Sequence, residues 1–149
     1  MTAAVHLAGP DQAEVCFALV SQYHAEAGLP YDDAHRAGVI APLLEGSPLG
    51  AIWLLGPVRS PLGYVLVTFD WSVAAGGMTG WVAEMFVRDK VRGRGIGTES
   101  LHAVAKALRS AGVKALHVDL GAPESPVRRF WANAGFRGET TRRVLTDKL

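Results

Sequence analysis

Residues 92–98 read RGRGIGT, and this stretch lies between an apolar segment at 79–87 (TGWVAEMFV) and a segment at 96–111 with helical spacing. In the second segment, apolar residues recur every three or four positions, at Leu101, Val104, Ala105 and Leu108. Glycines at 93, 95 and 97 let the backbone bend close to a ligand, and the first amides of a helix have no intrahelical partner. The sequence therefore predicts a strand, an anion-binding loop and a helix, in that order.

The loop favours a phosphate ligand because Arg92 and Arg94 add charge-assisted donors to the positive end of the helix dipole. Its Gly-x-Gly-x-Gly spacing lacks the Gly-Lys-Ser/Thr ending of a Walker loop and differs from the Gly-x-Gly-x-x-Gly of a dinucleotide-binding fingerprint. A nucleic-acid-binding patch needs aromatic residues among the basic ones, and the loop has none. On its own, a glycine-rich turn identifies its ligand only loosely.

Charge is divided unevenly along the chain. Residues 1–87 hold two basic and eight acidic side chains, a net charge of −6, whereas residues 88–149 hold thirteen basic and six acidic ones, a net charge of +7. The basic part suggests a polyanionic ligand, and the acidic part suggests that a second ligand is cationic. Unrelated solvated surfaces are the alternative explanation.

The order of the predicted elements is typical of one mixed α/β domain over residues 1–149. Besides the segments that flank the loop, we expect helices at about 10–27, 32–45 and 125–134. We expect strands at 3–7, 51–55, 63–72, 115–120 and, as one or two closing strands, 136–146. Within strand 79–87, alternation predicts one face with Met85 and Val87 and another with Val82, Glu84 and Phe86.

Composition predicts a soluble cytoplasmic protein. The N-terminus has no basic region followed by a long apolar run, and no apolar segment approaches the roughly 20 residues of a membrane span. The single cysteine, Cys16, has apolar neighbours and is expected in the core. The histidines show no metal-ligand spacing, so we expect no metal.

Two motifs resemble the GNAT superfamily of N-acetyltransferases. Residues 92–97 match its central pattern of a strand, Arg/Gln-x-x-Gly-x-Gly/Ala and a helix, and residues 130–136 (FWANAGF) resemble its second signature, an aromatic pair, three residues and Gly-Phe. The resemblance covers roughly residues 63–136. It implies an α/β fold of the α+β type, in which about four helices flank a mixed, mostly antiparallel sheet of six to seven strands. It also implies transfer of an acetyl group from acetyl-CoA to a primary amine, by direct attack in a ternary complex.

The resemblance also implies where acetyl-CoA binds. The ligand would lie where strand 79–87 splays from strand 115–120, with the pantetheine arm paired to backbone groups of Met85, Phe86 and Val87. The pyrophosphate would contact the amides of Arg92, Gly93, Arg94, Gly95, Ile96, Gly97 and Thr98. The amine acceptor is a small molecule, a peptide or a protein, and we expect neither a nucleic acid nor a membrane as partner. Relatives are often dimers, so a homodimer is one possible assembly.

Glu84 and Asp119 are the candidate catalytic residues. Glu84 is a lone carboxylate on an otherwise apolar strand, suited to accept the proton of the amine, directly or through water, or to anchor a cationic acceptor. Its alternative role is a salt bridge at a strand edge. Asp119 occupies the place where some relatives, such as the ribosomal-protein alanine acetyltransferases, carry a strand carboxylate that acts as base. Before Gly121, however, an aspartate often only caps a turn.

Two positions depart from the family pattern. Trp131 stands where the family usually has the tyrosine that acts as general acid, and indole has no ionisable proton to give, so packing is the expected role of Trp131. Glu124 replaces the usual asparagine. Ser125 or water are alternative acids, and an unassisted thiolate is a third possibility. These departures leave a second function open, a non-catalytic module that senses acyl-CoA.

Overall fold

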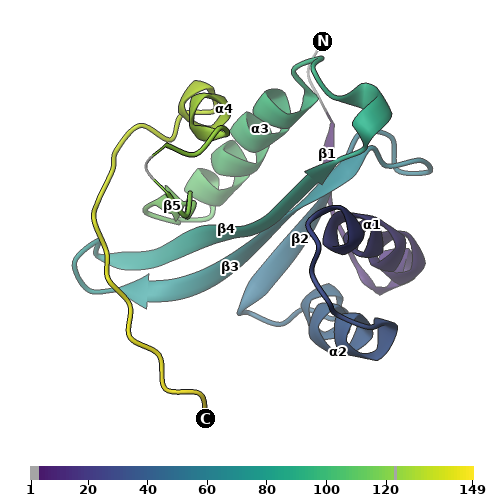
Figure 1. Cartoon of the computed structure of the whole chain (residues 1–149), viewed down its shortest axis with the longest axis horizontal. Coiled ribbons are helices and arrows are strands. Elements are labelled where there is room, and N and C mark those ends of the chain that lie inside the picture. The colour runs from purple at the N-terminus through teal and green to yellow at the C-terminus, as the bar shows by residue number, and fades with distance from the viewer. Residues whose placement is uncertain (1–3, 123) are drawn as a thin grey trace.

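The computed structural model describes residues 4–122 and 124–149 and contains a sheet of five strands in the order β1-β2-β3-β4-β5. The first four strands are antiparallel neighbours, and β5 runs parallel to β4 (Figure 1). The strands are β1 (Val5–Leu7), β2 (Gly50–Leu55), β3 (Gly63–Ser72), β4 (Gly77–Val87) and β5 (Leu116–His117).

Helices cover both faces of this sheet. The helices α1 (Ala13–Glu26) and α2 (Asp33–Leu44) lie on one face, and α3 (Ile96–Ser110) and α4 (Arg128–Asn133) on the other (Figure 1). Short 3-10 helices, η1 (Pro10–Gln12) and η2 (Asp89–Val91), precede α1 and follow β4. Each face has its own apolar core, one beneath α1 and α2 and one beneath α3 and α4. No helix in the described residues is long and apolar enough to cross a membrane.

The helix after the glycine loop starts where the sequence predicted. Gly95 has a φ of +79°, a left-handed conformation that favours glycine, and α3 begins at the next residue. Its apolar stripe of Leu101, Val104 and Leu108 is buried in the core on that face of the sheet. The first turn of α3 therefore follows the end of β4, after η2 and the glycine loop.

The predicted alternation along β4 is wrong at Val82, because a β-bulge interrupts the strand. Leu66 of β3 pairs with Glu84 and Val67 pairs with Val82, so Ala83 has no partner on β3. Val82 consequently joins Met85 in the core beneath α3. The bulge separates Glu84 from Val82 and leaves Glu84 on the face toward α1.

The α+β fold is confirmed. The expected number of six to seven strands is wrong for the described residues, which form five strands. Residues 136–146, predicted as closing strands, are irregular, and residues 137–149 are exposed. Residues 137–143 read RGETTRR and offer no apolar face to bury against the sheet. The tail is held by an ion pair between Arg128 and Glu139 and by the Arg142 guanidinium, which lies over the Trp81 ring. The predicted strand at 115–120 is shortened to β5.

Candidate active site

The strands β4 and β5 pair over two positions only, Gly80 with Leu116 and Trp81 with His117. Beyond Trp81, residues 82–87 of β4 have no strand neighbour on the β5 side among the described residues. The amide of Arg88 donates to the carbonyl of Leu62 at 2.8 Å, so the backbone groups of Arg88 point toward β3. Along a strand the N–H and C=O groups of every second residue point to the same side, so those of Phe86 point toward β3 as well. The N–H and C=O groups of Met85 and Val87 therefore face the open edge, where the pantetheine arm is predicted, and those of Phe86 do not.

The glycine loop turns sharply between η2 and α3. Gly93 and Gly95 have φ angles of +77° and +79°. The first intrahelical bond near the start of α3 is Glu99 N–H to Gly95 C=O at 3.0 Å, which leaves the amides of the first turn unpaired within the helix. A Cβ on Gly97 would lie 3.0 Å from the Phe130 ring and 3.2 Å from Met85 Cε, so glycine lets the three segments approach closely. The arrangement leaves the amides of residues 93–98 suited to bind an anion.

Arg92 differs from the rest of the loop. Its amide donates to Asp89 C=O at 3.2 Å, and both terminal guanidinium nitrogens donate to the Glu26 carboxylate at 2.7 Å. Its Nε donates to Val87 C=O at 2.7 Å, and the guanidinium lies over the Phe86 ring at 5.5 Å. The hydrogen bonds with Glu26 raise the pKa of Arg92 and lower that of Glu26. In this structure Arg92 ties the loop to α1 and β4, which differs from the phosphate contact expected of its side chain and amide.

Glu84 accepts two hydrogen bonds from residues that the sequence analysis did not select. His24 Nε2, on the last turn of α1, lies 2.7 Å from Glu84 Oε2, and the Tyr64 hydroxyl of β3 donates to Oε1 at 2.8 Å. Burial, followed by the charge of Glu84, raises the pKa of Tyr64 far above its ordinary value, so Tyr64 stays a neutral donor. The Glu84 side chain is 19% exposed, whereas His24 and Tyr64 are buried.

A partial signal existed for Tyr64, one of the two missed residues. Tyr64 lies two residues before Leu66 on β3 and on the same face, and Leu66 pairs with Glu84 on β4. Tyr64 and Glu84 therefore share one face of the sheet. His24 follows a run of apolar residues on a helix, and nothing local to it indicates a partner 60 positions further along the chain.

Asp119 lies at an exposed turn after β5. Its Oδ1 accepts the amide of Gly121 at 2.8 Å, and Gly121 has a φ of +78°. This is the turn-capping arrangement considered as the alternative to catalysis.

Trp131 is buried in the core beneath α3, where Phe130 and Phe136 meet its ring edge-on at centroid distances of 5.1 and 5.2 Å. Packing is therefore the role that the structure gives this residue, as the sequence predicted.

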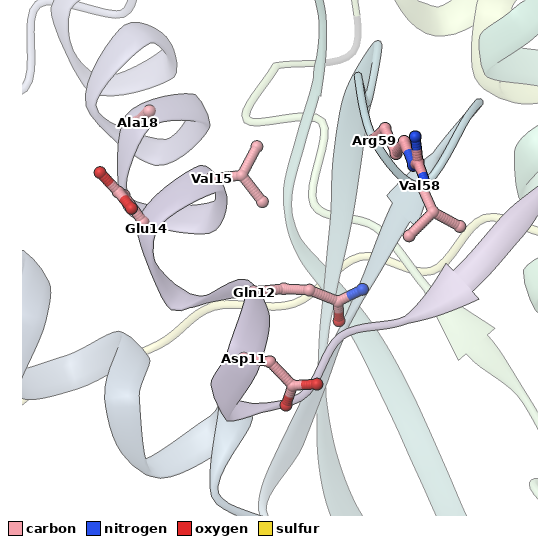
Figure 2. Close-up of a pocket in the computed structure, with 7 residues that line it drawn as sticks. All are labelled: Asp11, Gln12, Glu14, Val15, Ala18, Val58 and Arg59. Atoms are coloured by element: carbon pink, nitrogen blue, oxygen red, sulfur yellow. The ribbon is translucent and has the colours of Figure 1, made fainter.

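A separate pocket of about 360 Å³ opens between the start of α1 and the loop after β2 (Figure 2). Its wall contains neither Glu84 nor the glycine loop, and is formed by Asp11, Gln12, Glu14, Val15, Ala18, Val58 and Arg59. Over residues 4–122 and 124–149, no three His, Cys, Asp or Glu side chains gather in a way that could hold a metal ion.

Comparison with known proteins connects this geometry to a family. Residues 16–136 match the family described as acetyltransferase (GNAT) family. An integron cassette protein from the mobile metagenome of Cole Harbour Salt Marsh is 32% identical with a TM-score of 0.82, over 97% of this chain and 90% of that one. Among curated proteins the chain has no match.

Two further solved structures share the fold at lower identity. A ribosomal-protein-alanine N-acetyltransferase from Brucella melitensis biovar Abortus 2308 is 17% identical with a TM-score of 0.74, over 99% of this chain and 100% of that one. AAC(6')-Iy, solved with the bisubstrate analog CoA-S-monomethyl-acetylneamine, is 15% identical with a TM-score of 0.80, over 100% and 99% of the two chains.

Proposed function

The chain belongs to the acetyltransferase (GNAT) family, and we propose that it transfers an acetyl group from acetyl-CoA to a primary amine, by direct attack in a ternary complex. One observation carries the proposal. Glu84, a partly exposed carboxylate held by His24 and Tyr64, directly precedes the open backbone edge of β4 at Met85 and Val87. A carboxylate at this position supports proton acceptance next to the predicted thioester.

The donor site is proposed from backbone groups. The amides of residues 93–98, at the N-terminus of α3, fit a diphosphate because they are clustered and the helix dipole adds positive charge. Met85 and Val87 present backbone groups on the open edge of β4 to the pantetheine arm. The CoA-containing analog bound to AAC(6')-Iy supports a CoA donor for this fold. Arg92 holds the loop in place, and its contact with Val87 C=O must open if the pantetheine arm takes that carbonyl.

The reaction raises two questions about protons: how the amine loses one, and whether the leaving sulfur gains one. An alkyl ammonium with a pKa of about 10.4 must lose a proton before its nitrogen attacks, and Glu84 is positioned to receive it. The nitrogen then bonds to the carbonyl carbon, the C–S bond breaks, and the nitrogen loses its second proton to water. Trp131 has no proton to give, and Tyr64 is buried with a raised pKa. We therefore propose that CoA leaves as the thiolate, whose conjugate thiol has a pKa of about 8.5, or takes its proton from water.

An acyl-CoA sensor without turnover is the second candidate, favoured by Trp131 in the place of the usual acid. A sensor has little use for a carboxylate that two side chains hold beside the thioester. Glu84 is therefore the residue that distinguishes the enzyme from the sensor.

The test is release of CoA thiol from acetyl-CoA against a panel of amines, with calorimetry of CoA binding in parallel. Glu84→Gln keeps the size of the side chain and removes the proton acceptor, so we expect amine-dependent release to fall about 100- to 10,000-fold with CoA affinity unchanged. Cys16 is buried, and burial raises its pKa to about 11, so a thiol reagent reports CoA rather than the protein. CoA binding without amine-dependent release from any acceptor in wild type would favour the sensor.

A further inference from the structure

His24 contacts the proposed proton acceptor Glu84, and the state of its own imidazole is a separate question. It lies on the last turn of α1 and is 3% exposed. Its Nε2 meets Glu84 Oε2 at 2.7 Å, while its Nδ1 is buried and has no hydrogen-bond partner within the described residues. A buried polar atom without a partner is uncommon in folded proteins, so the protonation of this ring is strongly constrained.

Aromatic side chains surround the rest of the imidazole. Tyr23 of α1 lies at a ring-centroid distance of 5.8 Å and Tyr31, before α2, at 5.2 Å. His35 of α2 stacks on Tyr31 at 4.5 Å and not on His24. The titratable groups that face this cluster are thus Tyr23, Tyr31 and His35 from the helical side, and Tyr64 and Glu84 from the sheet. Among the residues that the structure describes, only Glu84 forms a hydrogen bond with the His24 ring.

This environment selects one protonation state. A proton on Nε2 makes a charge-assisted N–H···O bond to Glu84 and leaves only a lone pair on Nδ1. A proton on Nδ1, in the other neutral tautomer or in an imidazolium, would be a buried donor without an acceptor. The neutral Nε2–H tautomer is therefore the state that the geometry favours.

We propose that His24 is a positioning residue that holds Glu84 ready to accept the proton of a cationic amine; this inference rests on the proposed function. A neutral His24 adds no positive charge, so Glu84 keeps its full negative charge for an ammonium. Each Glu84 oxygen accepts one hydrogen bond from the protein and has a second lone-pair position. One ammonium proton passes to a Glu84 oxygen, the freed nitrogen pair forms the C–N bond, the C–S bond pair leaves with the CoA sulfur, and the nitrogen then loses its second proton to water. His24 takes no proton in this step.

The kinetic test compares His24→Gln with His24→Leu. Glutamine places a side-chain N–H donor in nearly the position of Nε2 and does not titrate, so we expect kcat within about 3-fold of wild type. Leucine has no donor, so we expect kcat to fall about 10- to 100-fold with an unchanged KM for acetyl-CoA. His102→Gln, at an exposed position of α3, is the matched control and should leave both constants unchanged.

The outcomes separate the two proposals. A wild-type kcat in His24→Leu, or equal losses in the glutamine and leucine variants, would overturn the role of His24 and leave the proposed function standing. Wild-type protein that is inactive toward every amine would overturn the proposed function, and the role of His24 with it.

A measurement on wild-type protein tests the tautomer even if His24→Leu does not fold. We expect the His24 Nε2 proton as a downfield 15N–1H signal that exchanges slowly with water, and no Nδ1 proton. This signal should be absent in His24→Gln and retained in His102→Gln. A proton on Nδ1 at pH 7 would overturn the proposal.

Discussion

The two faces of β4 use different parts of the chain to build the candidate site. Toward α3, the site consists of backbone groups, namely the open edge at Met85 and Val87 and the amides after Gly93. Toward α1, it consists of side chains, with Glu84 held by His24 and Tyr64. The first is encoded in a few adjacent residues, and the second is assembled from three elements far apart in the sequence. A donor shared by a whole family suits the first arrangement, and an acceptor particular to one member suits the second.

A β-bulge in β4 determines which side chains lie on each face. Because Ala83 has no partner on β3, Val82 joins the core beneath α3 while Glu84 stays on the face toward α1. Mutations on either face should therefore separate donor binding from catalysis.

The largest effect on the donor side is expected from Gly95→Ala. Alanine at a φ of +79° is strained, and relief of that strain would move the first amides of α3. We expect CoA affinity to fall about 30-fold, measured by calorimetry, together with a loss of about 1 kcal/mol of stability. Gly76→Ala is the matched control, since Gly76 has a φ of +85°, similarly open space around it, and a place in the hairpin between β3 and β4. Equal CoA affinity in both variants would refute the role of the loop.

On the acceptor side, Tyr64→Phe removes the hydrogen bond to Glu84 Oε1 and keeps the buried ring. We expect kcat to fall about 10-fold with CoA affinity unchanged, because the carboxylate loses one of the two donors that orient it. Tyr23→Phe makes the same chemical change in a ring 6.3 Å away whose hydroxyl does not bond to Glu84, and should leave kcat unchanged. A similar loss in both variants would mean that the aromatic cluster, and not the hydrogen bond, supports the activity.

Arg92 joins the two faces, and a smaller effect is expected from Arg92→Ala. If Arg92 only holds the loop against Glu26 and Val87, CoA affinity should fall about 5-fold, and Glu26→Gln should produce part of the same loss without adding to it. A direct phosphate contact would instead give a much larger loss in Arg92→Ala and none in Glu26→Gln. The hydrogen bonds from Arg92 lower the pKa of Glu26, so the contribution of this pair is present at neutral pH and is lost as the pH falls through that lowered value.

The sequence predicted the strand, the glycine loop and the start of α3 correctly because this information is local. The glycines of residues 92–98 require particular backbone angles, and the helix that follows has a regular apolar stripe, so position along the chain determined position in space. Glu84 could also be selected, since a carboxylate on an apolar strand is conspicuous.

The partners of Glu84 and the closing strands could not be predicted in the same way. His24 reaches Glu84 only because α1 packs across β4, a consequence of tertiary structure that no spacing encodes. Alternation predicted the wrong face for Val82 because a bulge shifts the period of β4 by one residue. The strands expected at 136–146 did not form because that segment has little apolar surface to bury. The missed partner and the bulge come from tertiary packing, whereas the missing strands come from the composition of the segment itself.

Asp119 gives the smallest expected effect and the sharpest check on the acceptor side. Its carboxylate is exposed and already accepts the amide of Gly121, a bond that an asparagine oxygen can also accept. We therefore expect Asp119→Asn to change kcat less than about 2-fold, against the loss of at least about 100-fold expected in Glu84→Gln. Both variants exchange a carboxylate for an amide of the same size, so the comparison isolates the proton acceptor. A loss of 100-fold in Asp119→Asn with a modest one in Glu84→Gln would move the base from β4 to the turn after β5, and the network of His24 and Tyr64 would then hold a structural carboxylate.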